Sequence, residues 1–304
     1  MDNYSQYANL PAASPSPGVV SNLDNLPSRA LDLYIGMGTC IAVTTVLLAL
    51  RMYAKLVVTD KPGWEDCETR HSIIIQMLTA VVACLIGFTL FVAQIAVTFT
   101  ITGPHGALGT HVWDTTIGQY TKAYEQKSLV TIDLYPAAAF FIKLSLFLLY
   151  LRLFKPNRFT RWLNYGGIIT CGLFYSASII GNCVMFIPTP GQPNNNSAWL
   201  LRASEYSHRI LILSVVQSVF GTLSDIYLLV IPIQMIFQLH FPIERKIGVS
   251  AVFMIGILAI ACSLANLVYR VKELATIDHT WSGVTLYLFC SAELSAGLVA
   301  SDAL

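Results

Sequence analysis

The chain has 304 residues, of which 55% are hydrophobic and 12% are charged, whereas soluble domains carry about 25% charged residues. This composition excludes an ordinary soluble enzyme and indicates a protein that is dissolved in a lipid bilayer. The formal net charge of +1, with basic residues in short clusters beside apolar segments, also excludes a broad basic surface for nucleic acid.

The amino-terminal segment differs in composition from the rest of the chain. Residues 1–32 are rich in Pro, Ser and Asn and lack the basic and apolar regions of a cleaved signal peptide. We expect a disordered extracellular tail here, followed by a transmembrane domain over residues 33–304. Asn3 in the tail and Asn195 in a later connection stand in N-x-Ser sequences, so both are candidates for N-glycosylation.

Seven apolar segments are long enough to cross a hydrocarbon core about 30 Å thick, for which a helix needs about 20 residues. Pro136 and Pro232 lie inside the third and fifth segments, where we expect kinks because neighbouring helices can satisfy the freed carbonyl groups. The predicted fold class is therefore all-α, a polytopic bundle of seven transmembrane helices. The predicted spans are 33–50, 73–99, 129–151, 163–187, 210–238, 247–269 and 281–301.

The distribution of Lys and Arg predicts the orientation, because connections that are rich in these residues face the cytoplasm. The most basic connection holds Arg152, Lys155, Arg158 and Arg161, which places the amino terminus outside. In a receptor, this connection is where a cytosolic signalling protein would dock. Attraction to anionic lipid explains the same charges without a protein partner.

Three ionisable residues lie inside predicted spans, where an unpaired charge is costly. Lys143, Asp225 and Glu293 fall at a similar depth in the third, fifth and seventh spans, so we expect them to form one buried polar cluster. The cluster is either a structural clamp between helices or a switch that responds to a ligand or an ion. With all three ionised it carries a net negative charge, so one carboxyl is expected to be protonated.

The connection after the second span combines imidazole and carboxylate side chains with several glycines. His105, His111 and Asp114 could bind a metal ion or a ligand. Their spacing is unlike that of zinc sites, so we favour a lid over the end of the bundle and expect no metal.

Several short motifs follow one another along residues 31–304. They are Arg51-Met52-Tyr53, Gly63-Trp64-Glu65-Asp66, the segment 106–114, Lys143-Leu144-Ser145, Tyr150-Leu151-Arg152-Leu153-Phe154, Asp225-Ile226-Tyr227, Ile231-Pro232-Ile233, Lys246-Ile247-Gly248-Val249, Asp278-His279-Thr280-Trp281 and Glu293.

This series resembles the fungal rhodopsin-like integral membrane proteins, a family that includes receptor-like proteins of filamentous fungi. The chain departs from the family pattern in two places. Asn266 stands where the family usually has an Arg late in the sixth span, and the loop after the fourth span holds Cys183 where two Cys are usual.

The resemblance implies a receptor-like (GPCR-like) protein of the plasma membrane that senses an extracellular small molecule or a surface cue. A proton-coupled transporter and a structural membrane protein with a buried charge cluster remain alternatives. We expect no retinal and no other cofactor, because the seventh span has no Lys for a Schiff base. A membrane hydrolase would need metal ligands deep in the spans, yet the His residues lie at span edges or in loops, so we expect no enzyme.

Overall fold

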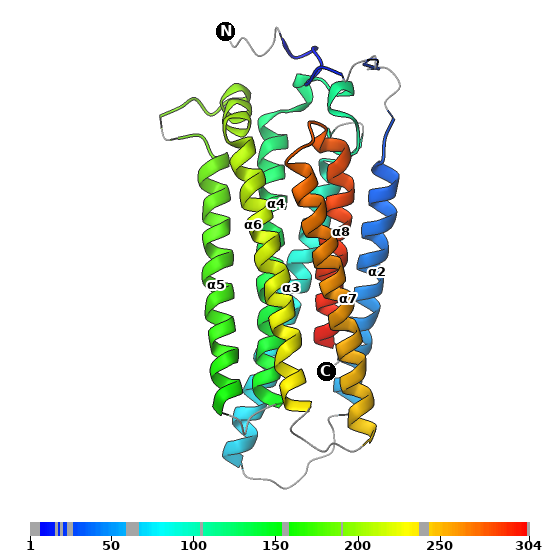
Figure 1. Ribbon diagram of the computed structural model, residues 1–304, viewed down its shortest axis with the longest axis vertical. Coiled ribbons are helices and arrows are strands. Elements are labelled where there is room, and N and C mark those ends of the chain that lie inside the picture. Colours follow the sequence, from blue (N-terminus) through cyan, green and yellow to red (C-terminus); the bar gives the residue numbers. More distant parts are fainter. Residues whose placement is uncertain are drawn as a thin grey trace.

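The computed structural model describes residues 7–15, 18, 21–22, 27–58, 67–103, 106–153, 158–189, 191–236 and 243–302. In this part of the chain, seven α-helices are long and apolar enough to cross a membrane, which confirms the predicted fold class. They stand side by side in one bundle (Figure 1). The helices are α2 (Ala30–Val58), α3 (Cys67–Thr100), α4 (Lys122–Leu153), α5 (Arg158–Phe186), α6 (Asn196–Ile236), α7 (Ile243–Glu273) and α8 (His279–Asp302).

Helices α4 and α6 are longer than the apolar segments that predicted them. Both continue through their prolines, Pro136 and Pro232. Helix α6 begins 14 residues before the predicted span. The prediction omitted these first turns because they contain polar residues such as Arg202. The start of the helix is fixed by Asn195, whose Oδ1 accepts a hydrogen bond from the backbone N–H of Ala198 at 3.0 Å, as an N-cap residue does.

Helix α4 lies at the centre of the bundle and packs against α3, α5, α6 and α8. Its side chains Ile142 and Phe147 belong to a buried core that α3 and α8 complete, with Phe91 and Leu298 among their contributions. The outward faces of the helices are also apolar, and Leu173 on α5 is 70% exposed. Such a surface is unfavourable in water but matches hydrocarbon.

Between α3 and α4 the chain forms a compact cover over one end of the bundle, which we call the lid segment (residues 101–121). It contains two short 3₁₀-helices, η1 (Val112–Asp114) and η2 (Ile117–Gln119), and lies at the same end as the amino terminus (Figure 1). The backbone N–H of Gly109 donates to the Thr280 carbonyl at 2.9 Å. The lid segment is thereby attached to the start of α8.

Part of the predicted disordered tail is paired with the lid segment. The N–H of Ala12 donates to the Thr115 carbonyl at 2.9 Å, and the N–H groups of Ile117 and Gly118 donate to the carbonyls of Leu10 and Ala8 at 3.0 and 2.8 Å. Residues 8–12 are therefore a second layer of the cover.

Candidate functional site

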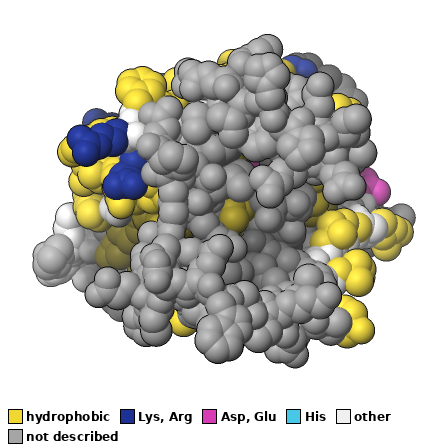
Figure 2. All heavy atoms as spheres, turned by 90° about the horizontal axis from the view of Figure 1, so that it is seen from below, with side chains coloured by type: hydrophobic (Ala, Val, Ile, Leu, Met, Phe, Trp, Pro, Cys, Tyr) yellow, Lys and Arg dark blue, Asp and Glu magenta, His cyan; other side chains and the backbone are white. Residues whose placement is uncertain are grey.

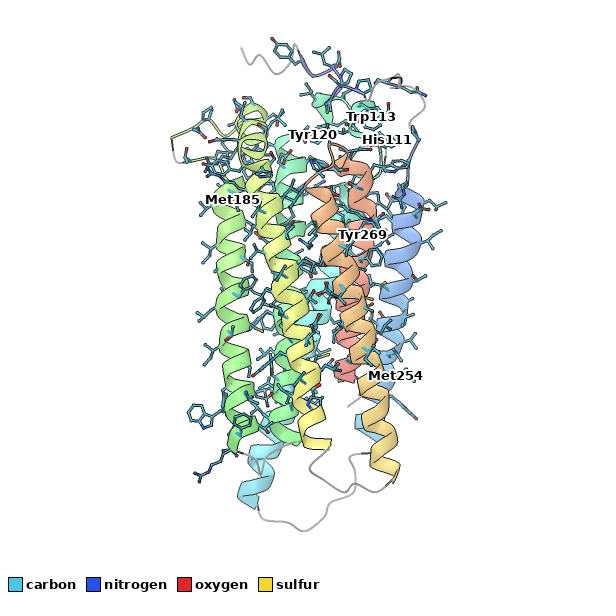
Figure 3. All side chains as sticks on the ribbon, in the orientation of Figure 1. His111, Trp113, Tyr120, Met185, Met254 and Tyr269 are labelled. Atoms are coloured by element: carbon cyan, nitrogen blue, oxygen red, sulfur yellow. The ribbon has the colours of Figure 1, made fainter. Side chains whose placement is uncertain are left out.

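A cavity of about 650 Å³ lies beneath the lid segment, within the range of about 300–1,000 Å³ that is usual for small-molecule sites. Residues of the six helices α3 to α8 form its walls, and Leu108, Val112 and Ile117 of the lid segment line its outer part. Most of the lining surface is apolar, and polar side chains such as Glu125, Gln217 and Arg270 interrupt it. Figure 3 shows Tyr120, another lining residue, at the lid end of the bundle.

Arg270 is the principal cation of the cavity lining, and its side chain is only 7% exposed. Its guanidinium donates three hydrogen bonds, to Asn266 Oδ1 at 3.1 Å, the Ser214 carbonyl at 3.2 Å and Cys290 Sγ at 3.3 Å. It also lies 5.1 Å from the centre of the Tyr135 ring, which adds a cation–π contact.

The sequence placed Arg270 in a connection beyond the sixth span, and this placement was wrong because α7 continues to Glu273. The available signal was the spacing of Asn266 and Arg270, since residues four apart share one face of a helix. The Arg that the family pattern leads one to expect at position 266 is thus present one turn later.

A chain of hydrogen bonds leads from the cavity toward the middle of the bundle. Asn266, which accepts from Arg270, donates from Nδ2 to Glu293 Oε2 at 2.8 Å. The same carboxylate oxygen accepts a hydrogen bond from the Tyr135 hydroxyl at 2.9 Å. We call the series Arg270–Asn266–Glu293 the polar relay. It connects α7 to α8 and, through Tyr135, to α4.

Lys143 and Asp225 form the predicted buried pair, with 2.7 Å between Nζ and Oδ1. Lys143 also donates to the Gly221 carbonyl at 2.9 Å and to Ser224 Oγ at 2.5 Å, so all three ammonium protons have acceptors. Asp225 accepts a further hydrogen bond from Ser263 Oγ at 2.5 Å.

Glu293 lies close to this pair, with its Oε1 3.5 Å from the position of a Cβ atom on Gly221, but in the described part of the chain it is not hydrogen bonded to Lys143 or Asp225. Its carboxylate has its own donors in Asn266 and Tyr135, so it does not need the ammonium of Lys143. Arg270, which the sequence analysis did not include among the buried charges, supplies a second cation beside the negative charge predicted for the three residues. With all four groups ionised, the charges in this part of the core are balanced.

The lid segment is held down by an aromatic and ionic clamp. His111 Nδ1 lies 2.5 Å from Asp278 Oδ2, and the N–H of Val112 donates to Asp278 Oδ1 at 2.9 Å. The His111 ring stacks on Trp113 and Trp281 with ring centres 4.6 and 4.0 Å apart; Figure 3 labels His111 and Trp113 at this end. Two motifs that are 167 positions apart therefore meet in space.

Asp114 also serves the cover, since its Oδ1 accepts a hydrogen bond from the N–H of Asn22 at 2.9 Å. Among the described residues, no group of three His, Cys, Asp or Glu side chains is arranged to hold a metal ion. His111 and Asp114 both make hydrogen bonds that hold the cover together.

We expect Asp278→Ala to loosen the lid segment, because the variant loses the partner of His111 and the acceptor for Val112. Loss of a partly buried charged hydrogen-bond partner costs about 2 kcal/mol, or roughly 30-fold in the opening equilibrium. Hydrogen–deuterium exchange of residues 106–121 measures this change. Asp32→Ala is the control, because Asp32 is 60% exposed and pairs with Arg29 on the surface. Equal exchange in both variants would show that the clamp does not hold the lid.

Several predicted site residues lie outside the described part of the chain or at its edge. These are Asn3, His105 and Lys155, together with the side chain of Arg152. Arg158 and Arg161 begin α5 with exposed side chains. Figure 2 views the end opposite the lid and shows basic side chains at its left edge and at its upper right edge.

Comparison with known proteins gives a family match over most of the chain. The model of the fungal rhodopsin domain matches residues 50–302. A SAT4 family membrane protein of Emericella nidulans is 30% identical over 199 residues, which are 65% of this chain and 48% of the relative. Receptor GIN3 of Arthrobotrys oligospora is 27% identical over 224 residues, which are 71% of this chain and 50% of the relative.

A third relative aligns over nearly the whole chain. Fugralins biosynthesis cluster protein 2 of Gibberella zeae is 23% identical over 293 residues, which are 94% of this chain and 67% of the relative. The chain spans about half the length of the SAT4 family protein and of Receptor GIN3. No solved structure gives a significant match.

Proposed function

Because the chain belongs to the fungal rhodopsin domain family, we propose that it is a receptor-like protein that binds an extracellular small molecule in the cavity beneath the lid segment. In this proposal the lid end and the amino terminus face outward from the plasma membrane, and the basic connection before α5 faces a cytosolic signalling partner. The name of Receptor GIN3 supports this class of function.

The observation that carries the proposal is the position of the cavity above the polar relay. Arg270 lines the cavity and begins the relay, so a molecule that contacts its guanidinium would alter the hydrogen bonds of Asn266 and Glu293. These residues belong to α7 and α8, and Tyr135 adds α4. A ligand would thereby change the contacts between three helices, which is the differential interaction that a conformational switch needs.

Two amide side chains in the cavity wall also favour a polar occupant. Gln94 Oε1 and Gln217 Nε2 are buried and have no hydrogen-bond partner in the described part of the chain. Buried amide groups are nearly always satisfied, so an unpaired acceptor and donor beside a cavity point to a ligand or bound water.

A tryptophan that fills the cavity tests the proposal directly. Ile210 lines the cavity, whereas Ile212, two residues along the same helix, is 45% exposed on the outside of the bundle. We expect Ile210→Trp to weaken small-molecule binding by at least about 10-fold, because overpacking costs roughly 1–3 kcal/mol. Ile212→Trp should bind like the wild type.

The measurement uses the full chain in lipid nanodiscs and a panel of small amines, carboxylic acids, alcohols and neutral aromatic compounds. Binding is detected by thermal shift and confirmed by native mass spectrometry. A bimane label on Met254→Cys, near the opposite end of α7, reports whether bound compounds change the bundle. Binding that Ile210→Trp leaves intact would exclude this cavity as the ligand site.

A further inference from the structure

Glu125 is a buried carboxylate at the lid end of α4 that has no partner in the described part of the chain. Its side chain lines the cavity and is 6% exposed. Within the described residues, nothing hydrogen bonds to the carboxylate and nothing forms an ion pair with it. An uncompensated buried charge costs several kcal/mol of free energy, so this carboxylate is stabilised by binding a proton or a cation.

The local helix geometry does not remove this cost. Thr121 caps the helix, with its Oγ1 accepting a hydrogen bond from the N–H of Tyr124 at 3.2 Å, and Glu125 stands in the first turn. A carboxylate near a helix N-terminus gains only about 0.3–1 kcal/mol. The helix therefore makes a negative charge tolerable at this position but does not neutralise it.

The two other charged side chains that line the cavity, Arg270 and Glu273, already have partners. Arg270 is linked through Asn266 to Glu293. Glu273 Oε1 lies 3.0 Å from His279 Nδ1 and accepts a further hydrogen bond from a serine hydroxyl of α8. Of the Arg and Glu side chains that line the cavity, the carboxylate on the first turn of α4 alone remains without a partner in the described chain.

Two tyrosine rings close to Glu125 in the sequence line the same cavity. Tyr120 and Tyr124 line the cavity on either side of the helix start and meet edge to face, with ring centres 5.3 Å apart. Burial raises the pKa of Tyr120 to about 12, and the negative charge of Glu125 adds to the shift, so the phenol stays neutral. A cavity that is lined by neutral aromatic rings and a carboxylate suits an organic cation, because both kinds of group attract positive charge.

We propose that the cavity takes a protonated amine with an apolar body, and that the ammonium binds Glu125 beside Tyr120 and Tyr124. This inference rests on the proposed function, namely that the cavity is the ligand site. The apolar part of the molecule lies along the predominantly apolar wall, where Ile132 and Leu286 are among the lining residues. The amine is either a free compound or the headgroup of a lipid.

The test compares matched compounds on matched variants. Phenylalkyl amines and the alcohols and carboxylic acids of the same length are measured on the full chain in nanodiscs of phosphatidylglycerol, which carries no amine. We expect Glu125→Gln to weaken amine binding by at least about 30-fold, since removing one partner of a buried charge pair has effects of this size. The alcohols should bind both proteins equally.

Two controls separate charge loss from misfolding. Glu205→Gln makes the same chemical change at a side chain that is 64% exposed and should leave amine binding unchanged. The melting temperature of Glu125→Gln without amine should equal or exceed that of the wild type, because a buried unpaired carboxylate has been removed.

Addition of phosphatidylethanolamine to the nanodiscs tests whether the amine is a lipid headgroup. Competition between this lipid and the free amines would support a lipid source.

The outcomes distinguish this inference from the proposed function. Equal amine binding by wild type and Glu125→Gln, a preference for carboxylic acids, or no amine binding would overturn the amine assignment. If carboxylic acids were preferred, Arg270 would be the residue that binds the charged group, and the cavity would remain the ligand site. Binding that Ile210→Trp does not affect would instead overturn the proposed function.

Discussion

Lys143→Met is expected to lower the free energy of unfolding by about 3–5 kcal/mol, which is typical when one partner of a buried ion pair is removed. The methionine fills much of the same volume, so the loss comes from Asp225, which keeps a charge without its cation. The lower stability should appear as a reduced melting temperature and as unfolding at a lower fraction of dodecyl sulfate in mixed micelles.

The double variant Lys143→Met/Asp225→Asn separates pairing from packing. We expect it to regain most of the lost stability, because a neutral amide still bonds to Ser263 and no buried charge remains. Lys127→Met is the control on the same helix, since this lysine is exposed and should change stability by less than about 0.5 kcal/mol. A double variant as unstable as the sum of the single variants would mean that charge pairing is not the cause.

Gly106→Ala is expected to disrupt the lid segment more severely than the loss of Asp278. A Cβ atom at this position would overlap the carbonyl group of Ile101, which is a backbone atom pair and cannot rotate away. The turn is closed by the N–H of Leu108, which donates to that same carbonyl at 3.2 Å. The chain must open this turn, at a cost of about 3 kcal/mol.

Hydrogen–deuterium exchange should therefore rise by roughly 100-fold over residues 106–121, the factor that corresponds to a change of this size. Gly38→Ala provides the control, because a Cβ there would meet open space. Alanine also favours a helix over glycine by up to about 1 kcal/mol. If the lid exchanged at the same rate in both glycine variants, the close approach of Gly106 to Ile101 would not constrain the turn.

The number and order of the transmembrane helices could be predicted from sequence, because hydropathy alone identifies segments that suit a bilayer. The contact between Lys143 and Asp225 was also predictable, since buried charges in a membrane must find a partner. The start of α6 was not, because its first turns are polar and stand outside the apolar segment. An N-cap at Asn195 was the available signal.

The positions of the charged side chains around the cavity were harder to predict, again because polar helix ends lie outside the apolar segments. Glu125 and Arg270 both lie beyond the ends of the apolar segments that predicted α4 and α7, so the sequence assigned them to connections. Each lies inside a helix that continues past its apolar segment. Which polar side chains meet across such helix ends depends on helix rotation and tilt, and hydropathy carries no information about either.

The double cover over the cavity bears on how long a bound molecule would stay. Ala12 lines the cavity, and residues 8–12 are bonded across the lid segment. A molecule could leave by this route only when two hydrogen-bonded layers separate together. Differences in affinity between related complexes usually lie in the dissociation rate. Residues 8–12, which belong to the amino-terminal tail, would then slow the dissociation of a bound molecule.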